Sequence, residues 1–290
     1  MKIGIDIGNY NVKTSKDVIF KSAISTTEHF NNNSDVLVLN GVTYYVGDGN
    51  LEIDFVKFKK DNYIPLLIAS ICKSMITMSN DIKLGVGLPL NQFKKHSEEL
   101  KDMLLNKEFK GYFNGNKFNI RIISVNVFPE GVAGYIANYG KFSDIIDNRD
   151  VIVVDIGGKT TDIALIQNNK VVQNSTVSYG TIDIYNTIKL ELEKKFTDIK
   201  VSIDKIEHYI KYGFYYKNKL TDIGFAIKKA INIYQDIYNE LKLNYPINTE
   251  FVILSGGGSY LLGNIFKSKM SVKIDNDVFA NAKGYEKLLK

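Results

Sequence analysis

Apolar positions in the first half of the chain alternate between the spacing of strands and the spacing of helices. Side chains of a strand change face at every residue, whereas those of a helix return to one face about every 3.6 residues. The helical spacing predicts helices at residues 61–79, 91–107 and 131–146. The strand spacing predicts extended segments at residues 2–8, 12–24, 36–39, 43–46, 82–88, 111–113 and 118–127.

Two Asn-Gly pairs mark the tightest turns of this half. Asn40-Gly41 lies between two of the predicted strands, and Asn114-Gly115 lies between two others. Both residues of such a pair accept the positive φ angles that two-residue hairpin turns need. The pattern therefore predicts two β-hairpins in the first half of the chain.

The second half repeats the order of strands followed by helices. Its strands are predicted at residues 151–155, 161–166, 170–177 and 251–254, with Asn168-Asn169 as a turn. Its helices are predicted at residues 181–195, 203–212, 219–243 and 277–289. Strands and helices in the same order twice predict an α/β architecture with an internal duplication.

A short polar break near residue 150 separates the halves, and the length suits two domains of about 150 residues each. The expected units are a first domain over 1–150 with a small β-rich insertion around 25–60, a second domain over 151–274 with a helical insertion around 181–246, and a C-terminal helix over 275–290 that returns to the first domain. No Pro- or Ser-rich linker lies between the halves, so we expect them to pack together across a hinge.

The amino-acid composition excludes several classes of protein. Apolar residues make up 44% and charged residues 24% of the chain, which is typical of a globular protein and argues against disorder. No apolar run approaches the roughly 18 residues of a membrane span, and Asp6 interrupts the start where a signal peptide would stay apolar. Cys72 is the single cysteine, so disulfides and thiolate metal clusters within the chain are excluded. We expect a cytoplasmic protein.

The formal net charge is +5, from 37 basic and 32 acidic residues that are scattered along the chain. Small basic clusters occur, such as Lys57-Phe58-Lys59-Lys60. We favour solvated surface over a nucleic-acid groove for these clusters, because no long basic stripe supports the second interpretation. Direct binding to nucleic acid or to a membrane is therefore not expected.

One short pattern occurs twice, 149 residues apart, around Asp6 and around Asp155. Each copy predicts a buried strand that ends on a carboxylate and breaks into a Gly-containing turn, although a plain Asp-initiated turn is the simpler alternative. Backbone N–H groups of such turns can hold phosphate oxygens, and the carboxylates can hold the waters of Mg²⁺. The candidate metal-shell and catalytic acids are Asp6 and Asp155, and the candidate phosphate-binding residues are Gly8, Asn9, Asn11, Lys13, Gly157, Gly158, Lys159, Thr160 and Thr161.

Two further segments are candidates for the same site. Gly256-Gly257-Gly258 and Tyr260 form a Gly-rich turn before a short helix, where a base or a phosphate can lie against bare backbone. Glu130 follows Pro129 at the start of a predicted helix. It fits equally a stabilising N-terminal acid and a group that orients or deprotonates an attacking water.

These segments together resemble the actin-like ATPase superfamily of actin, Hsp70 and sugar kinases, along essentially the whole chain. The likeness rests on Asp6–Lys13, Phe128–Gly134, Asp155–Asp162, Leu254–Gly258 and Phe279–Tyr285, which look like two phosphate loops, two connecting helices and an adenosine motif. The resemblance implies duplicated, ribonuclease H-like α/β domains with a nucleotide cleft between them. It also implies Glu130 as the water-activating residue, with Gly180 and Asp183 near the ribose.

Among members of this superfamily, the chain is most similar to ParM-type plasmid-segregation and archaeal-type proteins. This resemblance implies hydrolysis of ATP, or GTP, with Mg²⁺, head-to-tail filaments of the protein itself, and a DNA-binding adaptor on a plasmid centromere. Asn11 stands where many relatives place a small residue or a hydroxyl, which questions a direct phosphate contact there. A small-molecule kinase of the same fold and a nucleotide-binding scaffold without filaments are the alternatives, whereas the lone Cys72 excludes an iron–sulfur ATPase activator.

Overall fold

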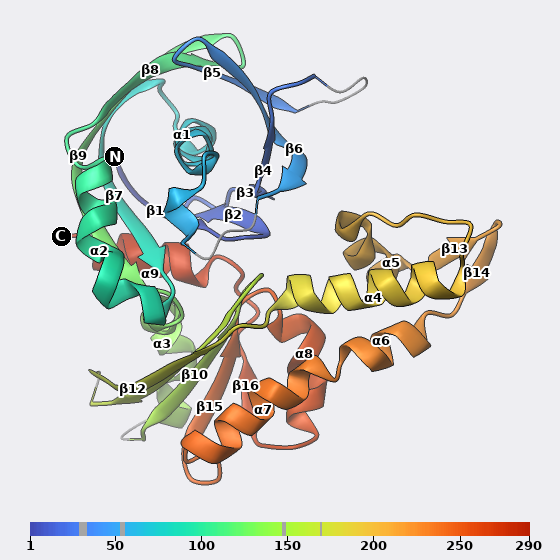
Figure 1. Cartoon of the computed structure of the whole chain (residues 1–290). Helices are drawn as coiled ribbons and strands as arrows, with labels where there is room; N and C mark the ends of the chain where they lie inside the picture. The colour runs from blue at the N-terminus through green and yellow to red at the C-terminus, as the bar shows by residue number, and fades with distance from the viewer. Residues whose placement is uncertain (29–33, 53–55, 147–148, 169) are drawn as a thin grey trace.

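The computed structural model describes residues 1–28, 34–52, 56–146, 149–168 and 170–290. Two lobes face each other, and each is built on one sheet (Figure 1). Within the described residues, the first sheet has nine strands in the order β3 (Ile19–Lys21), β2 (Asn11–Thr14), β1 (Lys2–Ile7), β7 (Ser79–Leu88), β9 (Asn116–Pro129), β8 (Glu108–Phe113), β5 (Asp35–Leu39), β6 (Val42–Leu51) and β4 (Ala23–Ser25). We call the part of the chain around this sheet the first lobe.

The second lobe repeats the central part of the first. Its described strands lie in the order β12 (Lys170–Val177), β11 (Thr161–Gln167), β10 (Val151–Ile156), β15 (Phe251–Ser255) and β16 (Val272–Ile274). Running from β12 to β16, the pairings are antiparallel, antiparallel, parallel and parallel. The pairings from β3 through β2, β1 and β7 to β9 have the same senses. The duplicated α/β fold predicted from the sequence is therefore confirmed.

Helices cover the first sheet from within and from outside. Its helical elements are η1 (Lys57–Lys59), α1 (Tyr63–Ser74), α2 (Leu90–Leu104), α3 (Val132–Ile146) and the C-terminal α9 (Ala280–Leu288). The sheet curls around α1, which is seen end-on inside the ring of strands in Figure 1. Nearly the whole of α1 is buried for this reason, rather than one stripe of it. The last helix, α9, packs on β1 and α3 and so joins the end of the chain to its beginning.

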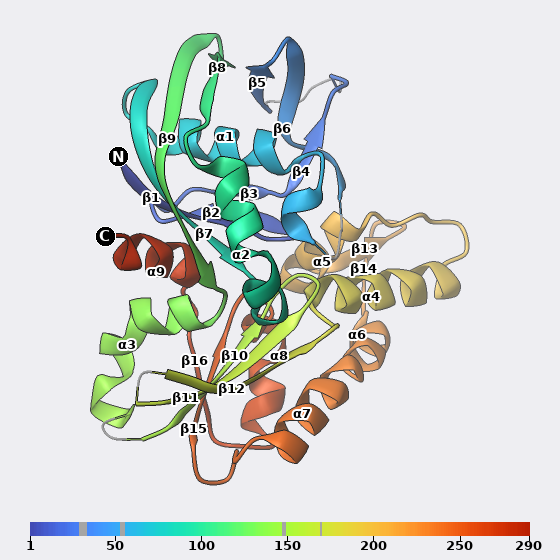
Figure 2. The same ribbon diagram turned by 60° about the vertical axis from the view of Figure 1, so that its left-hand side comes forward.

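The second lobe carries a helical extension on one side. Its helical elements are α4 (Thr181–Lys195), η2 (Ile203–Lys205), α5 (Ile206–Tyr212), α6 (Gly224–Ala230), α7 (Ile233–Asn244) and α8 (Ser259–Lys267). A small hairpin, β13 (Phe214–Tyr216) and β14 (Lys219–Thr221), joins α5 to α6. Figure 2 shows α4, α5 and this hairpin extending to one side of the second lobe. Among the helices that the structure describes, none has the length and apolar content needed to cross a membrane.

Strand β10 shows why the lobes hold together. All six of its residues are buried, as expected for a central strand with both faces covered. Ile152 and Val154 point into the core shared with α4 and α7, whereas Val151 and Val153 point into a separate core with α2 and α3. Because α2 and α3 follow strands of the first sheet, this second core joins the lobes.

Local predictions were confirmed at the hairpins and wrong in one helix. Asn40 and Gly41 have φ angles of 52° and 79°, and Asn114 and Gly115 have 48° and 78°, as the two-residue turns require. The single helix predicted over 219–243 is instead β14, α6 and α7, because the chain turns at Asp222 and again near Ile231. Asn169 of the predicted turn lies outside the described residues, and Asn168 has a φ of 48°.

Candidate functional site

The two repeated turns have the same backbone geometry. In the first, the Gly8 N–H donates to the Asn11 carbonyl oxygen at 3.1 Å. In the second, the Gly157 N–H donates to the Thr160 carbonyl oxygen at 2.9 Å. The turns follow β1 and β10, which hold equivalent places in their sheets. The duplication therefore reproduces the turn itself as well as the strand order.

Both turns open onto one cavity of about 740 Å³ between the lobes. This volume lies within the range of roughly 300–1,000 Å³ that small-molecule sites occupy. A Cβ built on Gly158 would lie 3.2 Å from the Tyr10 backbone nitrogen, so the turns nearly touch across the lobes. The predicted residues that line the cavity are Asp6, Gly8, Asn9, Asn11, Lys13, Glu130, Asp155, Gly157, Gly158, Lys159, Thr160, Gly256, Gly257 and Tyr260.

The Gly-rich turn before α8 forms another wall of this cavity. Gly256 has a φ of 79°, and a Cβ there would lie 2.3 Å from the Asp155 carboxylate, so a larger side chain would not fit. The neighbouring Ser255 also lines the cavity. Its hydroxyl is buried and has no hydrogen-bond partner among the described residues. A buried hydroxyl of this kind is suited to a polar ligand.

Two known protein families match the two halves of the chain. Residues 4–132 match "Actin like proteins N terminal domain". Residues 153–268 match "Archaeal actin homologue MreB-like, C-terminal". The chain belongs to the actin-like superfamily. No curated protein shows a significant sequence match to it.

Solved structures show the same actin-like fold. An archaeal actin homologue in complex with ADP has a TM-score of 0.83 to this chain at 23% identity, over 99% of this chain and 98% of its own. The ParM filament from Clostridium botulinum has a TM-score of 0.78 at 24% identity, over 99% and 97% of the two chains. At these identities the likeness establishes the fold alone.

Four of the predicted site residues do not line the cavity of this actin-like chain. Thr161 is fully buried, and its hydroxyl donates to the Tyr179 carbonyl oxygen. Gly258 packs against the Ile156 side chain. Gly180 and Asp183 lie behind the second turn, where Asp183 accepts from the Gly180 N–H and pairs with Lys159 at 3.0 Å. They support the turn rather than face the cavity.

The cavity also contains residues that are not among the predicted site residues. They are Tyr10, Ile19, Lys57, Asp162, Thr181, Tyr185, Glu207, Ile210, Lys211, Tyr212, Ser255, Ser259, Leu261, Asn276, Asp277, Val278, Ala280 and Asn281. Glu207 to Tyr212 belong to α5 of the helical extension, which no motif marked. A signal existed for the residues that stand within the segments carrying the resemblance, which are Tyr10, Asp162, Ser255, Ala280 and Asn281.

Asn281 connects the second turn to the start of α3. Its side-chain N–H donates to the Asp155 carboxylate at 2.8 Å, and its oxygen accepts from the Gly131 N–H at 2.9 Å. Gly131 directly follows Glu130. A single amide of α9 therefore fixes the distance between two of the proposed catalytic carboxylates.

Acidic groups outnumber basic ones inside the cavity. Of the described residues that line it, Asp6, Glu130, Asp155 and Asp162 are buried carboxylates, and Lys57 is the one buried lysine. Burial raises the pKa of Asp155 against the Asn281 hydrogen bond, and burial raises the pKa of Asp162 to about 6 against the Thr176 hydrogen bond. A cation bound in the cavity would offset this excess of buried negative charge.

The donor set fits Mg²⁺ carried by a nucleotide. No cluster of three or more His, Cys, Asp or Glu side chains in the described part of the chain could hold a metal unaided. Mg²⁺ usually keeps several waters and binds one or two carboxylates together with substrate phosphates. Asp6 and Asp155 line the cavity from opposite lobes and would supply these two carboxylates.

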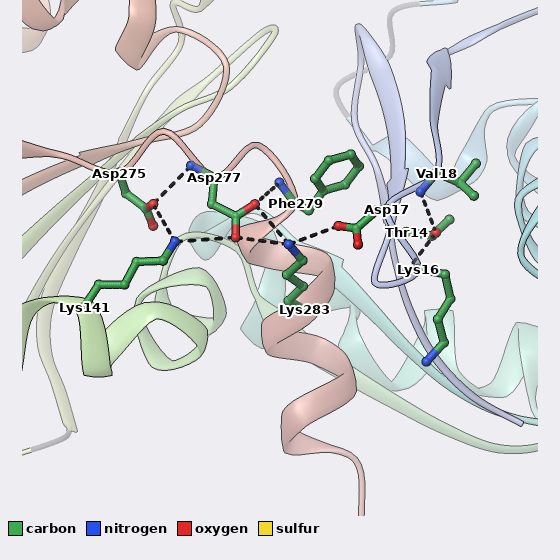
Figure 3. A network of polar contacts seen from close by, with 9 residues as sticks. All are labelled: Thr14, Lys16, Asp17, Val18, Lys141, Asp275, Asp277, Phe279 and Lys283. Atoms are coloured by element: carbon green, nitrogen blue, oxygen red, sulfur yellow. Dashed lines mark hydrogen bonds and ion pairs between the residues drawn. The ribbon is translucent and has the colours of Figure 1, made fainter.

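A polar network crosses the junction of the lobes beside the cavity (Figure 3). Lys283 of α9 lies 3.0 Å from Asp17 of the first lobe and 3.3 Å from Asp277. Lys141 of α3 lies 3.6 Å from both Asp277 and Asp275. Asp277 also lines the cavity. Asp277 in the wall of the cavity therefore contacts both connecting helices, α3 through Lys141 and α9 through Lys283.

Proposed function

We propose that this actin-like chain binds ATP, or GTP, with Mg²⁺ in the cavity between its lobes and hydrolyses it. The observation that carries the proposal is the pair of equivalent turns, one from each lobe, around a single cavity. Their backbone N–H groups suit phosphate oxygens, and the Gly-rich turn before α8 suits the rest of the nucleotide. The archaeal homologue solved with ADP supports this assignment.

Catalysis in this site consists of positioning and charge stabilisation, as in phosphoryl transfer generally. Glu130 orients the attacking water and accepts its proton. Lys13, which lies 3.6 Å from Asp6, offsets the charge of the phosphates. Mg²⁺ bound with the nucleotide would neutralise phosphate charge, and Asp6 and Asp155 would hold its waters.

The proposal includes assembly of the protein into filaments. The two lobes close on the nucleotide. They comprise residues 1–150 and 151–274, and residues 275–290 return to the first lobe. A head-to-tail contact between copies builds an open filament, and a contact that favours the closed form makes assembly depend on nucleotide. The ParM filament structure supports this step. We propose a cytoplasmic filament that moves plasmid copies through a DNA-binding adaptor.

Glu130→Gln tests the chemistry. Turnover should fall by about 10²–10⁴-fold while nucleotide binding persists, because the amide cannot accept the proton. Phosphate release and calorimetry with ADP measure the two quantities. Glu108→Gln, about half-exposed on β8, is the matched control and should behave as wild type. Wild-type turnover in the Glu130 variant would remove this residue from the mechanism.

One observation favours a small-molecule kinase as the second candidate. A kinase of this fold needs a carboxylate in the cleft to deprotonate a hydroxyl of its substrate, and Asp162 lines the cavity without a role in the first proposal. Release of ADP that depends on a sugar from a panel would support the kinase. Filaments seen by electron microscopy with ATP and Mg²⁺, and absent without them, would support the first proposal.

A further inference from the structure

The basic cluster at residues 57–60 is not the solvated surface that the sequence indicates. Lys57 is 7% exposed and Lys60 is 6% exposed. Between them, Lys59 points outward, with its side chain 51% exposed, and pairs with Glu99. Lys57 begins the 3₁₀ helix η1 and Lys60 follows its end in extended backbone, and both side chains are buried.

The two buried lysines bind two predicted site residues. The Lys57 ammonium lies 2.7 Å from each carboxylate oxygen of Glu130. The Lys60 ammonium donates to the side-chain oxygen of Asn9 in the first turn. Phe58 is also buried and packs edge-on against His96 of α2. The Lys60 and Phe58 contacts fix η1 independently of the Lys57–Glu130 pair.

Glu130 needs a partner of this kind to act as a base. A carboxylate removed from water becomes protonated at neutral pH unless a cation lies beside it. Burial raises the pKa of Glu130, the Lys57 ammonium beside it opposes this rise, and the negative charges of Asp6 and Asp162 add to it. The charged and titratable groups that face Glu130 are Lys57 of η1, Asp6 of β1, Asp162 of β11, Tyr63 of α1 and Tyr285 of α9.

We propose that Lys57 is a positioning residue that keeps the Glu130 carboxylate ionised and directed into the cavity, an inference that rests on the proposed hydrolysis. Lys57 acts through Glu130, and the nucleotide is held by the two turns. Both oxygens of Glu130 contact the same ammonium, which fixes the plane of the carboxylate as well as its charge. The first lobe thus supplies the base with its counter-ion from a segment outside the five matching motifs.

The pH dependence of turnover tests this role. Activity should rise with pH as Glu130 loses its proton, and Lys57→Met should move this rise upward by about 1–3 pH units, the effect of removing an adjacent opposite charge. Lys57→Arg should keep the wild-type profile. Lys59→Met is the matched control from the same segment, and it should also keep the profile. Affinity for ADP should stay near wild type in all three variants.

Two results would overturn the proposal. An unchanged pH profile in Lys57→Met would show that Glu130 does not depend on this cation. A loss of ADP affinity as large as the loss of turnover would show that Lys57 holds the phosphates instead. In the Glu130→Gln background, Lys57→Met should lower turnover no further, because the two residues act as one unit.

A measurement without nucleotide separates this proposal from the proposed function. Infrared difference spectra between wild type and Glu130→Gln report the protonation of Glu130 directly. The pH at which Glu130 is half protonated should rise in Lys57→Met even if the protein hydrolysed nothing. If this midpoint did not change, the Lys57 proposal alone would be overturned. Absence of phosphate release with a normal midpoint shift would overturn the proposed function alone. Lys57→Gln replaces the methionine variant if that variant does not fold.

Discussion

The two turns at the cavity share a backbone and differ in charge. Asp6 on β1 lies opposite Lys13 on β2 in the strand register, and the two charges are 3.6 Å apart. Asp155 on β10 occupies the equivalent place but lies opposite another acid, Asp162 on β11. Its hydrogen-bond partner is the neutral amide of Asn281. One lobe therefore pairs its carboxylate with a cation, and the other adds a second carboxylate.

This difference shows that the turns are not interchangeable in the proposed chemistry. Lys13 beside the first turn pairs with the carboxylate of that turn, whereas Lys159 of the second turn pairs with Asp183 behind it. Like charges directly opposite one another destabilise a strand pair, so the second turn is unfavourable until a cation approaches. We infer that the second lobe contributes more to the metal and the first lobe more to the phosphates.

Of the variants that test this difference between the turns, Asp155→Asn should have the largest effect. Affinity for Mg²⁺ with ADP should fall by about 10–100-fold, the usual cost of losing a group that holds a metal through its waters. Calorimetry with and without Mg²⁺ measures it. Asp162→Asn, on the neighbouring strand, should lower this affinity by less, because Asp162 adds only further negative charge beside Asp155. Equal losses in the two variants would contradict the assignment of the metal to Asp155.

Removing the Asn281 amide should have the next largest effect. Asn281→Ala leaves the Asp155 carboxylate and the Gly131 N–H without their partner, at a cost of about 1–3 kcal/mol. The free energy of unfolding in urea should fall by this amount, and turnover should fall with it. Asn264→Ala, on the exposed face of α8, is the control. A stable but inactive Asn281→Ala would assign this amide to catalysis alone.

Lys13 and Lys159 lie beside the first and second turn, and Lys13 should contribute more to ADP binding. Lys13→Met should weaken ADP binding about tenfold, close to the loss of one hydrogen bond to a charged group. Lys159 is more exposed and pairs with Asp183, so Lys159→Met should cost less than about 1 kcal/mol. Fluorescence titration with ADP compares them. A larger effect at Lys159 would reverse the proposed division between the lobes.

The smallest effect should appear in the pH dependence of stability. The pKa of Asp162 is about 6 in the folded protein, above the value of about 3.9 for an unfolded Asp. The folded state binds this proton more tightly, so stability from this group is present at low pH and is lost as the pH rises through 6. Asp162→Asn should remove that dependence and raise the Tm at pH 8 by about 2–4 °C. Asp236→Asn, on the exposed face of α7, should change nothing.

Most of the fold and both turns could be predicted from local patterns. The strands before Asp6 and Asp155 are continuous apolar runs, and the Asn-Gly hairpins depend only on the two residues that need positive φ. The hairpin between β13 and β14 was missed because its turn uses Lys217-Asn218, with φ angles of 48° and 63°, instead of an Asn-Gly pair. A turn built from residues with no strong preference leaves little signal.

The missed site residues share a different cause. Lys57 is buried because its partner Glu130, 73 residues away, is brought beside it by the fold. Asn281 reaches Asp155 across 126 residues. A lysine or an asparagine without such a partner would lie in solvent, so composition and spacing favour the solvated interpretation. Contacts of this range depend on the packing of whole elements.

The position of α9 has a consequence for synthesis of the chain. This helix covers β1, its Tyr285 is fully buried, and the Lys2 ammonium contacts the Leu289 carbonyl oxygen at 3.1 Å. A ribosome adding about 5–20 residues per second releases β1 roughly a quarter of a minute to a minute before α9. The first lobe is therefore finished only after α9 has been translated, and a chain terminated before α9 presents an uncovered sheet face to chaperones and proteases.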